Sequence, residues 1–389
     1  MEPLKKLREF LYTPDHEGSH DPETLKALLR RQSEGIHLVY VEKLPQTEPE
    51  EHTFAAHVAA LANACGGFVL VGAVWNSKRS GPELGGLGAG DPEATTERLE
   101  EIVATHVEPK VDALVTTLRI AGGRHLAAVE VPRSLDAPHH IDGAYPLRVG
   151  REEKEMTPEE CERLKLARAG ERSNLRERAR AVALGHPEHD TLLRGRHGGV
   201  RGVFLYVASI PAVLSGRGVQ LRLPEGQLGF RVAGETLQAW VNSQKAYTFT
   251  GGGQLPMKFA VASREGEALF ASRDLAAFRV AAEKATAFGV EELEAFVVEA
   301  LRRDLPALEA IGFAGPFYAA LVVKPDRVSE LASQGGDEPR IALSTGSFNE
   351  DEPLLVDGVV PLAFHRRPSA DSVALPLIES LRSLASRAS

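Results

Sequence analysis

Apolar residues change their spacing several times along the first fifth of the chain, and each spacing predicts a different element. The run IHLVYVEKL (36–44) is rich in β-branched and aromatic residues, which is typical of a strand. Next, Phe54, Val58 and Leu61 recur at helical spacing between acidic residues and glycine, so we expect a helix over 48–65. The run GFVLVGAVW (67–75) is apolar throughout, which indicates a central strand buried on both faces.

The patterning continues to about residue 170. Asp91-Pro92 is an N-cap and first-turn pair that opens a helix to about residue 106. Two β-rich runs, joined through AGGR, predict a hairpin over 110–133. Thr157-Pro158 begins a long charged helix. With short helices expected near 3–12 and 22–33, this order describes one α/β domain of about 165 residues.

Beyond about residue 195 the pattern predicts more strands, and we find no catalytic or ligand-binding motif there. We expect helices near 235–244, 275–303 and 370–387 among these strands. The predicted fold class is α/β (α+β), with a first domain over 1–170, a basic helical linker over 171–194 and a second mixed α+β domain over 195–389. For the second domain we expect a role in oligomerisation or specificity.

Composition sets broad limits on the class of protein. The chain is 43% hydrophobic and 25% charged, as in ordinary globular proteins. No apolar run approaches the roughly 18 to 20 residues of a membrane helix, and the first residues carry no apolar signal-peptide core. The two cysteines exclude a disulfide scaffold and a cysteine-rich zinc site. We therefore expect a cytoplasmic protein, with Cys65 as a small buried residue.

The formal net charge of −9 argues against a globally basic surface, so nucleic-acid binding would need a local patch. One candidate patch is the stretch 163–201, with ten Lys or Arg against four acids. Arg168, Arg172, Arg176 and Arg180 recur every fourth residue and form one ridge of a helix. Such a ridge can follow a phosphate backbone, or it can be a solvated helix face paired with neighbouring glutamates.

Gly66-Gly67 raises the question of a phosphate loop. Phosphate loops run from strand through glycine to helix, so that backbone N–H groups face the anion. Here the order is helix, glycine, strand, which indicates a helix C-cap followed by a tight turn. The later GGLGAGDP has the phosphate-loop order but lacks the Lys-Ser/Thr pair of a Walker loop.

Several motifs in order resemble the Schlafen-type AlbA-like domain over about residues 30–165. AALANACGGFVLVGA resembles the AFANTxGGxLxIGV core of that family, which makes Asn63, Gly66, Gly67 and Gly72 its structural motif here. HVEPKV (106–111), VEVPRSLDAPHHIDG (129–143) and AYPLRVGREEKEMTPEE (144–160) follow with the family's spacing. The resemblance implies a nucleic-acid-associated fold.

Some members of the family are ribonucleases that hold a divalent metal with three carboxylates. The resemblance would give the first two roles to Glu34 and Glu42, the latter only with a shift of three residues. The third position, an aspartate after the second strand, is filled by Trp75 or Asn76. Because Asn lacks the charge that a Mg²⁺ site depends on, we expect a binding domain without a cofactor. A nuclease would need Mg²⁺ or Mn²⁺.

Candidate contacts to nucleic acid are the basic residues near the matched motifs and on the charged helix. These residues are Lys43, Lys78, Arg79, Arg148, Arg151, Arg168, Arg172 and Arg176. His139, His140 and Asp142 precede the YPLRVG strand and are candidates for substrate contact. HPEHD, with His186, His189, Asp190 and the later His197, has no zincin pattern, so we expect surface histidines there and no metal site.

Three functions remain open from the sequence. The first is a nucleic-acid-binding protein, for DNA or RNA, with a regulatory or defence-type role and a possible homodimer. The second is a metal-dependent endoribonuclease acting on tRNA-like RNA. The third is a protein-interaction scaffold without nucleic-acid contact.

Overall fold

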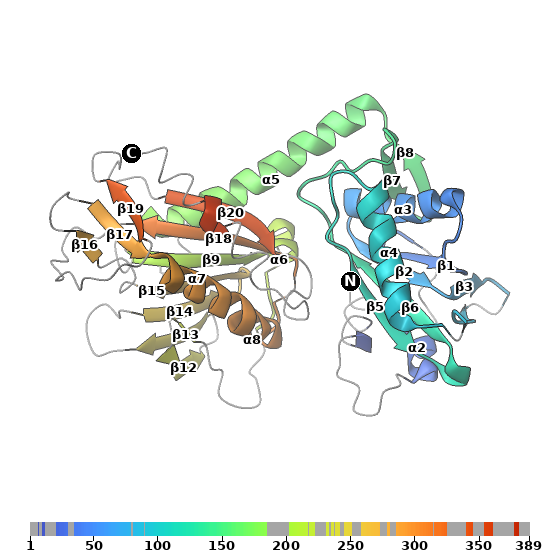
Figure 1. Ribbon diagram of the computed structural model, residues 1–389, viewed down its shortest axis with the longest axis horizontal. Helices are drawn as coiled ribbons and strands as arrows, with labels where there is room; N and C mark the ends of the chain where they lie inside the picture. The colour runs from blue at the N-terminus through green and yellow to red at the C-terminus, as the bar shows by residue number, and fades with distance from the viewer. Residues whose placement is uncertain are drawn as a thin grey trace. The chain divides into compact units, whose positions relative to one another are not determined.

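The computed structural model divides the chain into two compact units, Met1–Glu171 (unit 1) and Arg172–Ser389 (unit 2) (Figure 1). The residues that the structure describes are 7, 10–11, 21–29, 35–78, 81–88, 90–184, 202–216, 218–221, 231–232, 235–236, 238–241, 245–250, 258–272, 278–280, 285–313, 315–324, 340–344, 354–360 and 377–380.

Unit 1 is built on a four-stranded sheet in the order β1-β2-β6-β5. Its strands are β1 (Leu38–Val41), β2 (Gly67–Val71), β5 (Leu114–Arg119) and β6 (His125–Val131). β1 and β2 are parallel, whereas β6 runs antiparallel to both β2 and β5. The expected hairpin of β5 and β6 is confirmed. β2 is a central strand, and Phe68 to Val71 are buried, as its apolar run predicts.

Helices cover both faces of this sheet. α3 (Glu48–Asn63) and α4 (Pro92–His106) lie side by side over one face, where Phe54 and Leu99 pack on Val69 and Val129 (Figure 1). α2 (Pro22–Leu29) contributes Leu25 and Leu29 to the apolar cluster of the other face. The cap predicted at Asp91 is confirmed, because its side chain accepts the N–H of Glu93 at 2.9 Å. At the start of α3, Glu50 accepts the N–H groups of Gln46 at 2.9 Å and Thr47 at 3.0 Å, and these two hydrogen bonds lower the pKa of Glu50.

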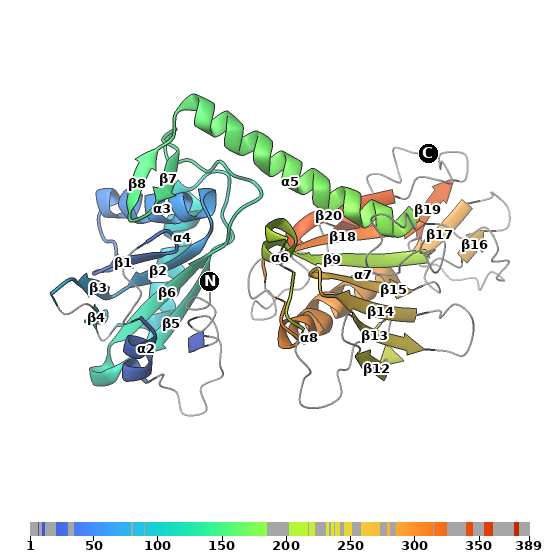
Figure 2. The same ribbon diagram turned by 180° about the vertical axis from the view of Figure 1, so that it is seen from behind.

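The apolar run 67–75 is not one strand. Gly72 has φ +92° and ends β2, after which β3 (Ala73–Asn76) pairs with β4 (Gly81–Leu84). This hairpin projects from the sheet in both views (Figure 2). The segment GPEL (81–84) therefore forms a strand, because it pairs with AVWN (73–76) in a register that local propensity did not indicate.

Unit 1 continues with a third hairpin and a long helix. β7 (Pro146–Val149) pairs with β8 (Glu152–Glu155), and β5 joins β6 through the short helix η1 (Ala121–Gly123). α5 (Pro158–Leu184) begins in unit 1 and ends in unit 2, so it includes part of the expected linker. The other linker residues, 185–194, lie outside the described residues.

Unit 2 contains a seven-stranded antiparallel sheet in the order β12-β13-β14-β15-β9-β18-β20. Its strands are β9 (Gly202–Ser209), β12 (Gln238–Val241), β13 (Lys245–Thr250), β14 (Lys258–Ser263), β15 (Glu267–Ser272), β18 (Phe317–Lys324) and β20 (Leu354–Val360). The shorter pairings involve β10 (Arg231–Val232), β11 (Glu235–Thr236), β16 (Phe278–Val280), β17 (Ala285–Gly289) and β19 (Arg340–Ser344). The helical elements are α6 (Ile210–Ser215), α7 (Val290–Glu299), η3 (Ala300–Asp304) and α8 (Leu305–Ala310).

The helix predicted over 235–244 was wrong, and the one predicted over 275–303 is confirmed only from residue 290 on, where α7 and η3 lie. The segment expected as a helix over 235–244 contains β11 and β12, and the one over 275–303 contains β16 and β17 before α7. In each case pairing with a neighbouring strand determines the structure where the side-chain spacing had indicated a helix. In the part of the chain that the structure describes, no helix has the length and apolarity to cross a membrane.

Candidate nucleic-acid interface

Three strands of the unit 1 sheet, β1, β5 and β6, have a basic residue next to the same edge, and the β3–β4 hairpin that follows β2 carries a fourth. β1 and β2 are parallel, so their carboxyl ends share this edge, and the register Val71↔Ala127 brings the start of β6 there too. β5 ends at the same edge, because Arg119 pairs with His125. We call four exposed residues the cationic edge: Lys43 after β1, Lys78 in the turn of the β3–β4 hairpin, Arg119 at the end of β5 and Arg124 before β6.

The carboxylates at this edge do not form the set that a nuclease needs. Glu42 is exposed after β1, and Asn76 donates its amide to Glu83 Oε1 at 2.7 Å. Asn76 Oδ1 also accepts the N–H of Lys78 at 2.9 Å, so Asn76 orders the hairpin turn. Among the described residues, no group of three His, Cys, Asp or Glu side chains could hold a metal ion. Glu34 lies outside those residues, so its assignment with Glu42 stays untested.

The opposite edge, at the amino ends of β1 and β2, contains the glycine pair. Gly66 has φ +69°, and a Cβ at Gly67 would lie 2.2 Å from the carbonyl oxygen of His37. Gly66 N–H bonds Leu61 O at 2.8 Å, which caps α3. The pair therefore ends a helix and lets β1 and β2 approach closely, which supports the structural interpretation over a phosphate loop.

Asn63 forms hydrogen bonds to two other segments at this edge of the sheet. Its amide nitrogen donates to His139 O at 2.9 Å and Pro146 O at 2.7 Å, and its Oδ1 accepts the N–H of His139 at 2.7 Å. Asn63 and His139 are buried, so these bonds join the end of α3 to the loop before β7. His139 Nδ1 bonds the carbonyl of Pro109 at 2.6 Å, and burial lowers the pKa of His139. His139 thus faces the interior, away from any substrate in solution.

Arg168 closes the carboxyl end of α3. Its Nη2 donates to the carbonyls of Asn63 at 3.0 Å and Ala64 at 3.1 Å, where the helix dipole is negative. Its Nη1 lies 3.3 Å from Glu171, which also pairs with Arg133. Burial lowers the pKa of Arg168, with the charge of Arg133 acting in the same direction. Burial raises the pKa of Glu171, but the two arginines together lower it below its usual value.

Arg148 also lies inside unit 1. Its side chain is 4% exposed, its Nε donates to Gly35 O at 3.0 Å, and its Nη1 lies 3.2 Å from Glu153. Glu153 in turn pairs with His57 of α3. A phosphate could reach Arg148 or Arg168 only if these partners were released, so the cationic edge is the better site for phosphate contact. Arg151, in the turn between β7 and β8, is exposed.

The later arginines of α5 contact the sheet of unit 2. Arg176 pairs with Asp357 of β20 at 3.4 Å, and Arg178 donates to the buried Glu267 of β15 at 2.7 Å. The hydrogen bond to Glu267 raises the pKa of Arg178. Arg172 and Arg180 also have interaction partners. The structure therefore supports a packing role for much of the predicted arginine ridge, and phosphate contact by Arg172 and Arg176 stays a prediction.

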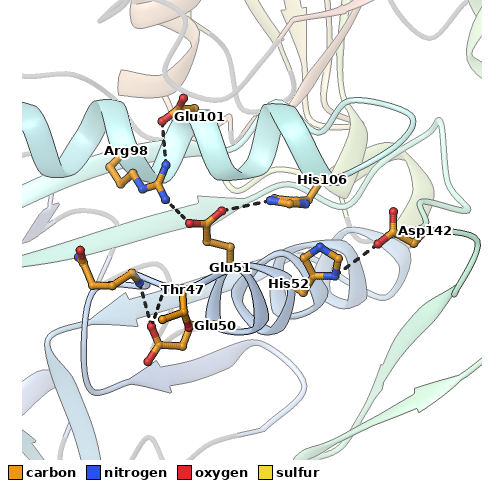
Figure 3. A network of polar contacts seen from close by, with 9 residues as sticks. Thr47, Glu50, Glu51, His52, Arg98, Glu101, His106 and Asp142 are labelled. Atoms are coloured by element: carbon orange, nitrogen blue, oxygen red, sulfur yellow. Dashed lines mark hydrogen bonds and ion pairs between the residues drawn. The ribbon is translucent and has the colours of Figure 1, made fainter.

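A polar network joins α3 to α4 on the helical face of unit 1 (Figure 3). Glu51 of α3 contacts Arg98 and His106 of α4, with the His106 Nε2 to Glu51 Oε2 distance at 3.3 Å. His52 lies 3.4 Å from Asp142 and meets the ring of His106 edge-on at 4.6 Å between centroids. Each histidine thus has a carboxylate partner within the fold.

Several sequence-based assignments receive a correction or lie outside the described residues. Cys65 is exposed, contrary to the expectation of a buried residue, because it lies in the turn between α3 and β2. His140 contacts Glu108 at 3.9 Å and the ring of Tyr145, and stays half-buried. The residues outside the described part are Glu34, Arg79, His186, His189, Asp190 and His197.

Sequence reasoning missed Arg119 and Arg124, two of the four residues of the cationic edge. The signal was present, because both arginines flank the turn of the predicted β5–β6 hairpin. The sequence does not reveal the strand order β1-β2-β6-β5, and this order brings the turn to the end of the sheet where β1 and β2 have their carboxyl ends. It also missed Glu83, whose contact with Asn76 depends on the β3–β4 register.

Charge is distributed unequally between the two units. Unit 1 contains 20 Lys and Arg and 29 Asp and Glu, which equals the formal net charge of −9 of the whole chain. Unit 2 contains 25 of each. A polyanion approaching unit 1 therefore meets overall repulsion, and any attraction must come from a local group such as the cationic edge.

Comparisons with known proteins find a family model that is similar to part of unit 1. Residues 40–157 match the family model described as Schlafen, AlbA_2. The N-terminal domain of a helicase RecG-related protein from Nitrosomonas europaea is 18% identical, with 40% of this chain and 92% of that domain covered and a TM-score of 0.22. The DIP2311 protein from Corynebacterium diphtheriae is 15% identical, with 50% of this chain but only 36% of that protein covered and a TM-score of 0.27. No curated protein matches the chain.

Proposed function

We propose that this chain, which carries a Schlafen AlbA_2 domain over residues 40–157, binds nucleic acid through the cationic edge of that domain and does not cleave it efficiently. The observation that carries the proposal is that exposed Lys43, Arg119 and Arg124 share the end of the sheet at which β1 and β2 have their carboxyl ends, with Lys78 in the turn of the hairpin that follows β2. In open α/β sheets, ligands commonly bind outside the carboxyl ends of the strands. The resemblance of the domain to nucleic-acid-associated proteins supports phosphate as the group that these cations contact.

The strength of such binding follows from the charges. Four cations that each release one counterion from the nucleic acid predict that log Kd rises with log salt with a slope of about +3 to +4. The net charge of −9 opposes association at longer range, so we expect weak binding that is lost at moderate salt.

The absence of efficient cleavage rests on Asn76. Its amide donates to Glu83, so the side chain that follows β2 offers no second carboxylate beside Glu42. A hard divalent cation binds carboxylate oxygens far better than a neutral amide that is already used as a donor. We expect no cleavage of RNA above background with Mn²⁺.

The test is binding of the full chain to labelled tRNA, single-stranded RNA and duplex DNA, measured by fluorescence anisotropy with Mn²⁺ and with EDTA. The edge variant replaces Lys43, Lys78, Arg119 and Arg124 by Gln. A matched control replaces Lys110, Lys154, Arg163 and Lys165 by Gln, which are also exposed and remove the same charge.

The edge variant should bind at least about tenfold more weakly, and the control should change the affinity by about twofold or less. Equal losses in the two variants would contradict the location. Metal-dependent cleavage would establish the endoribonuclease alternative, and no binding at low salt would favour a protein-interaction scaffold.

A homodimer, a cytoplasmic location and a regulatory or defence-type role belong to this proposal as expectations from the sequence. Unit 2 would then supply oligomerisation or specificity. Light scattering of the full chain with and without residues 202–389 tests whether unit 2 carries the self-association.

A further inference from the structure

We infer that the cationic edge takes a single strand and that one of its bases stacks on Trp75. This inference rests on the proposed function and specifies its ligand. It starts from an aromatic pair at the edge: the ring of Trp75 on β3 lies 6.1 Å from that of Tyr40 on β1, with an interplanar angle of 32°. Trp75 is half-buried, whereas Tyr40 is buried in the apolar cluster below it.

The support beneath Trp75 holds its ring in place. Its inner side packs on the apolar cluster that contains Tyr40, Phe68 and Leu70, and its strand partner is Pro82. Because this ring is already ordered, a base that stacks on its open side adds contact area with little further loss of side-chain entropy. Stacking of a base on an aromatic side chain raises the affinity by about fivefold to a hundredfold.

The alternation of side chains in the β3–β4 hairpin separates this platform from the nearest carboxylate. Glu83 pairs with Val74 across the hairpin, and its carboxylate accepts the amide of Asn76. Since successive residues of a strand point to opposite faces, Val74, Asn76 and Glu83 lie on one face and Trp75 on the other. The negative charge of Glu83 is therefore kept away from the face on which a base would stack.

Charge favours a single strand over a duplex. A duplex presents two phosphates per base pair and has its bases already stacked, so its binding would depend on electrostatic attraction to a unit with net charge −9. A single strand presents fewer phosphates and offers exposed base faces. Lys43 and Lys78 lie on the segments that directly follow β1 and β3, the strands of Tyr40 and Trp75, so we expect them to contact the phosphates that flank the stacked base.

The chain offers a clean probe, because it contains two tryptophans, Trp75 in unit 1 and Trp240 in unit 2. The full chain with Trp240→Phe reports on Trp75 alone. We expect oligo(dT) of about 12 nucleotides to quench the Trp75 emission with the same midpoint as its binding measured by anisotropy. A duplex of the same length should bind at least about tenfold more weakly and leave the emission nearly unchanged.

Three variants separate stacking from folding. Trp75→Ala should weaken oligo(dT) binding about tenfold, Trp75→Phe should retain most of the affinity, and Val74→Ala on the opposite face should bind as the parent does. If oligo(dT) binds but the Trp75 emission and the affinity of Trp75→Phe and Trp75→Ala all stay unchanged, the inference is wrong and the proposed function stands. If no nucleic acid binds the parent chain at low salt, the proposed function itself fails.

Discussion

The two ends of the unit 1 sheet use basic residues in opposite ways. At the amino ends of β1 and β2, Arg148 and Arg168 are buried and bond to backbone carbonyls and to Glu153 and Glu171. At the carboxyl ends, Lys43, Lys78, Arg119 and Arg124 are exposed. The position of a basic residue along the strand, more than its identity, therefore separates structural arginines from candidate phosphate contacts.

The same contrast applies to the two asparagines of the motif region. Asn63 at the amino end is buried and makes three hydrogen bonds that join segments far apart in the sequence. Asn76 at the carboxyl end is half-buried and bonds within its own hairpin. Substitutions at the amino end should thus affect folding, and those at the carboxyl end should affect binding.

The largest effect should come from Gly67→Ala. Its Cβ would lie 2.2 Å from His37 O, so the parallel pairing of β1 and β2 must shift, and we expect a loss of about 3 kcal/mol or more in the free energy of unfolding. Gly150→Ala is the control, since Gly150 has φ +63° but nothing within 4 Å of the added atom, and should cost about 1 kcal/mol. Urea unfolding followed by Trp75 emission in the Trp240→Phe chain measures both. Equal effects would mean that the close approach at Gly67 is unimportant.

Asn63→Ala should cause the second largest loss in the free energy of unfolding. It leaves the N–H and C=O of His139 and the carbonyl of Pro146 without their partner in a buried site, which costs about 2 to 3 kcal/mol. Asn76→Ala, the counterpart at the other end, should cost less than about 1 kcal/mol, because the hairpin polar groups can reach water. The same unfolding assay compares the two, and a larger cost at Asn76 would reverse the assignment of the two ends.

Acid should destabilise unit 1 in two stages. Burial lowers the pKa values of His125 and His139 in the folded state, so the unfolded chain binds protons more readily. Their contribution to stability is present above the unfolded pKa of about 6.5 and is lost as the pH falls below it. Glu50 and Glu171, whose pKa values are lowered, lose their contribution only as the pH falls below about 4.5.

The variant that isolates the first stage is His139→Asn, whose amide can replace the Nδ1 donor to Pro109 but does not titrate. Unfolding midpoints in urea at several pH values between about 7.5 and 5 should fall less steeply for this variant than for the parent. Parallel curves would show that His139 does not contribute to the acid sensitivity.

The smallest effect on stability should come from Lys78→Gln, because the side chain is exposed and its removal leaves no buried group unpaired. We expect a change within about 0.5 kcal/mol in unfolding, together with a decrease of about one in the salt slope of binding. Arg148→Gln should show the opposite pattern. Its free energy of unfolding should fall, and the salt slope of binding should stay unchanged in the fraction that remains folded. The two variants together test the contrast between the ends at single residues.

The sequence predicted the elements of unit 1 better than the roles of its basic residues. The run 67–71, the helix cap at Asp91 and the β5–β6 hairpin follow from local patterns, and the structure confirms them. The Schlafen AlbA-like resemblance also agrees with the match over residues 40–157.

What could not be predicted depends on contacts between distant segments. Arg148 and Arg168 looked like phosphate ligands because their partners, Gly35 O and Asn63 O, lie more than 100 residues away in the sequence. The strand order that brings Arg119 and Lys43 to the same end of the sheet is likewise a property of the folded chain. Local spacing carries no information about either.

Hydrogen exchange of the full chain with and without single-stranded RNA tests the central claim most directly. If the carboxyl ends of β1 and β2 form the interface, the RNA should protect amides in segments 42–47 and 73–84 and leave segments 61–67 and 145–149 unchanged. Protection confined to segments 61–67 and 145–149 would contradict the account, because it would place the nucleic acid at the end of the sheet where Asn63, Arg148 and Arg168 are buried.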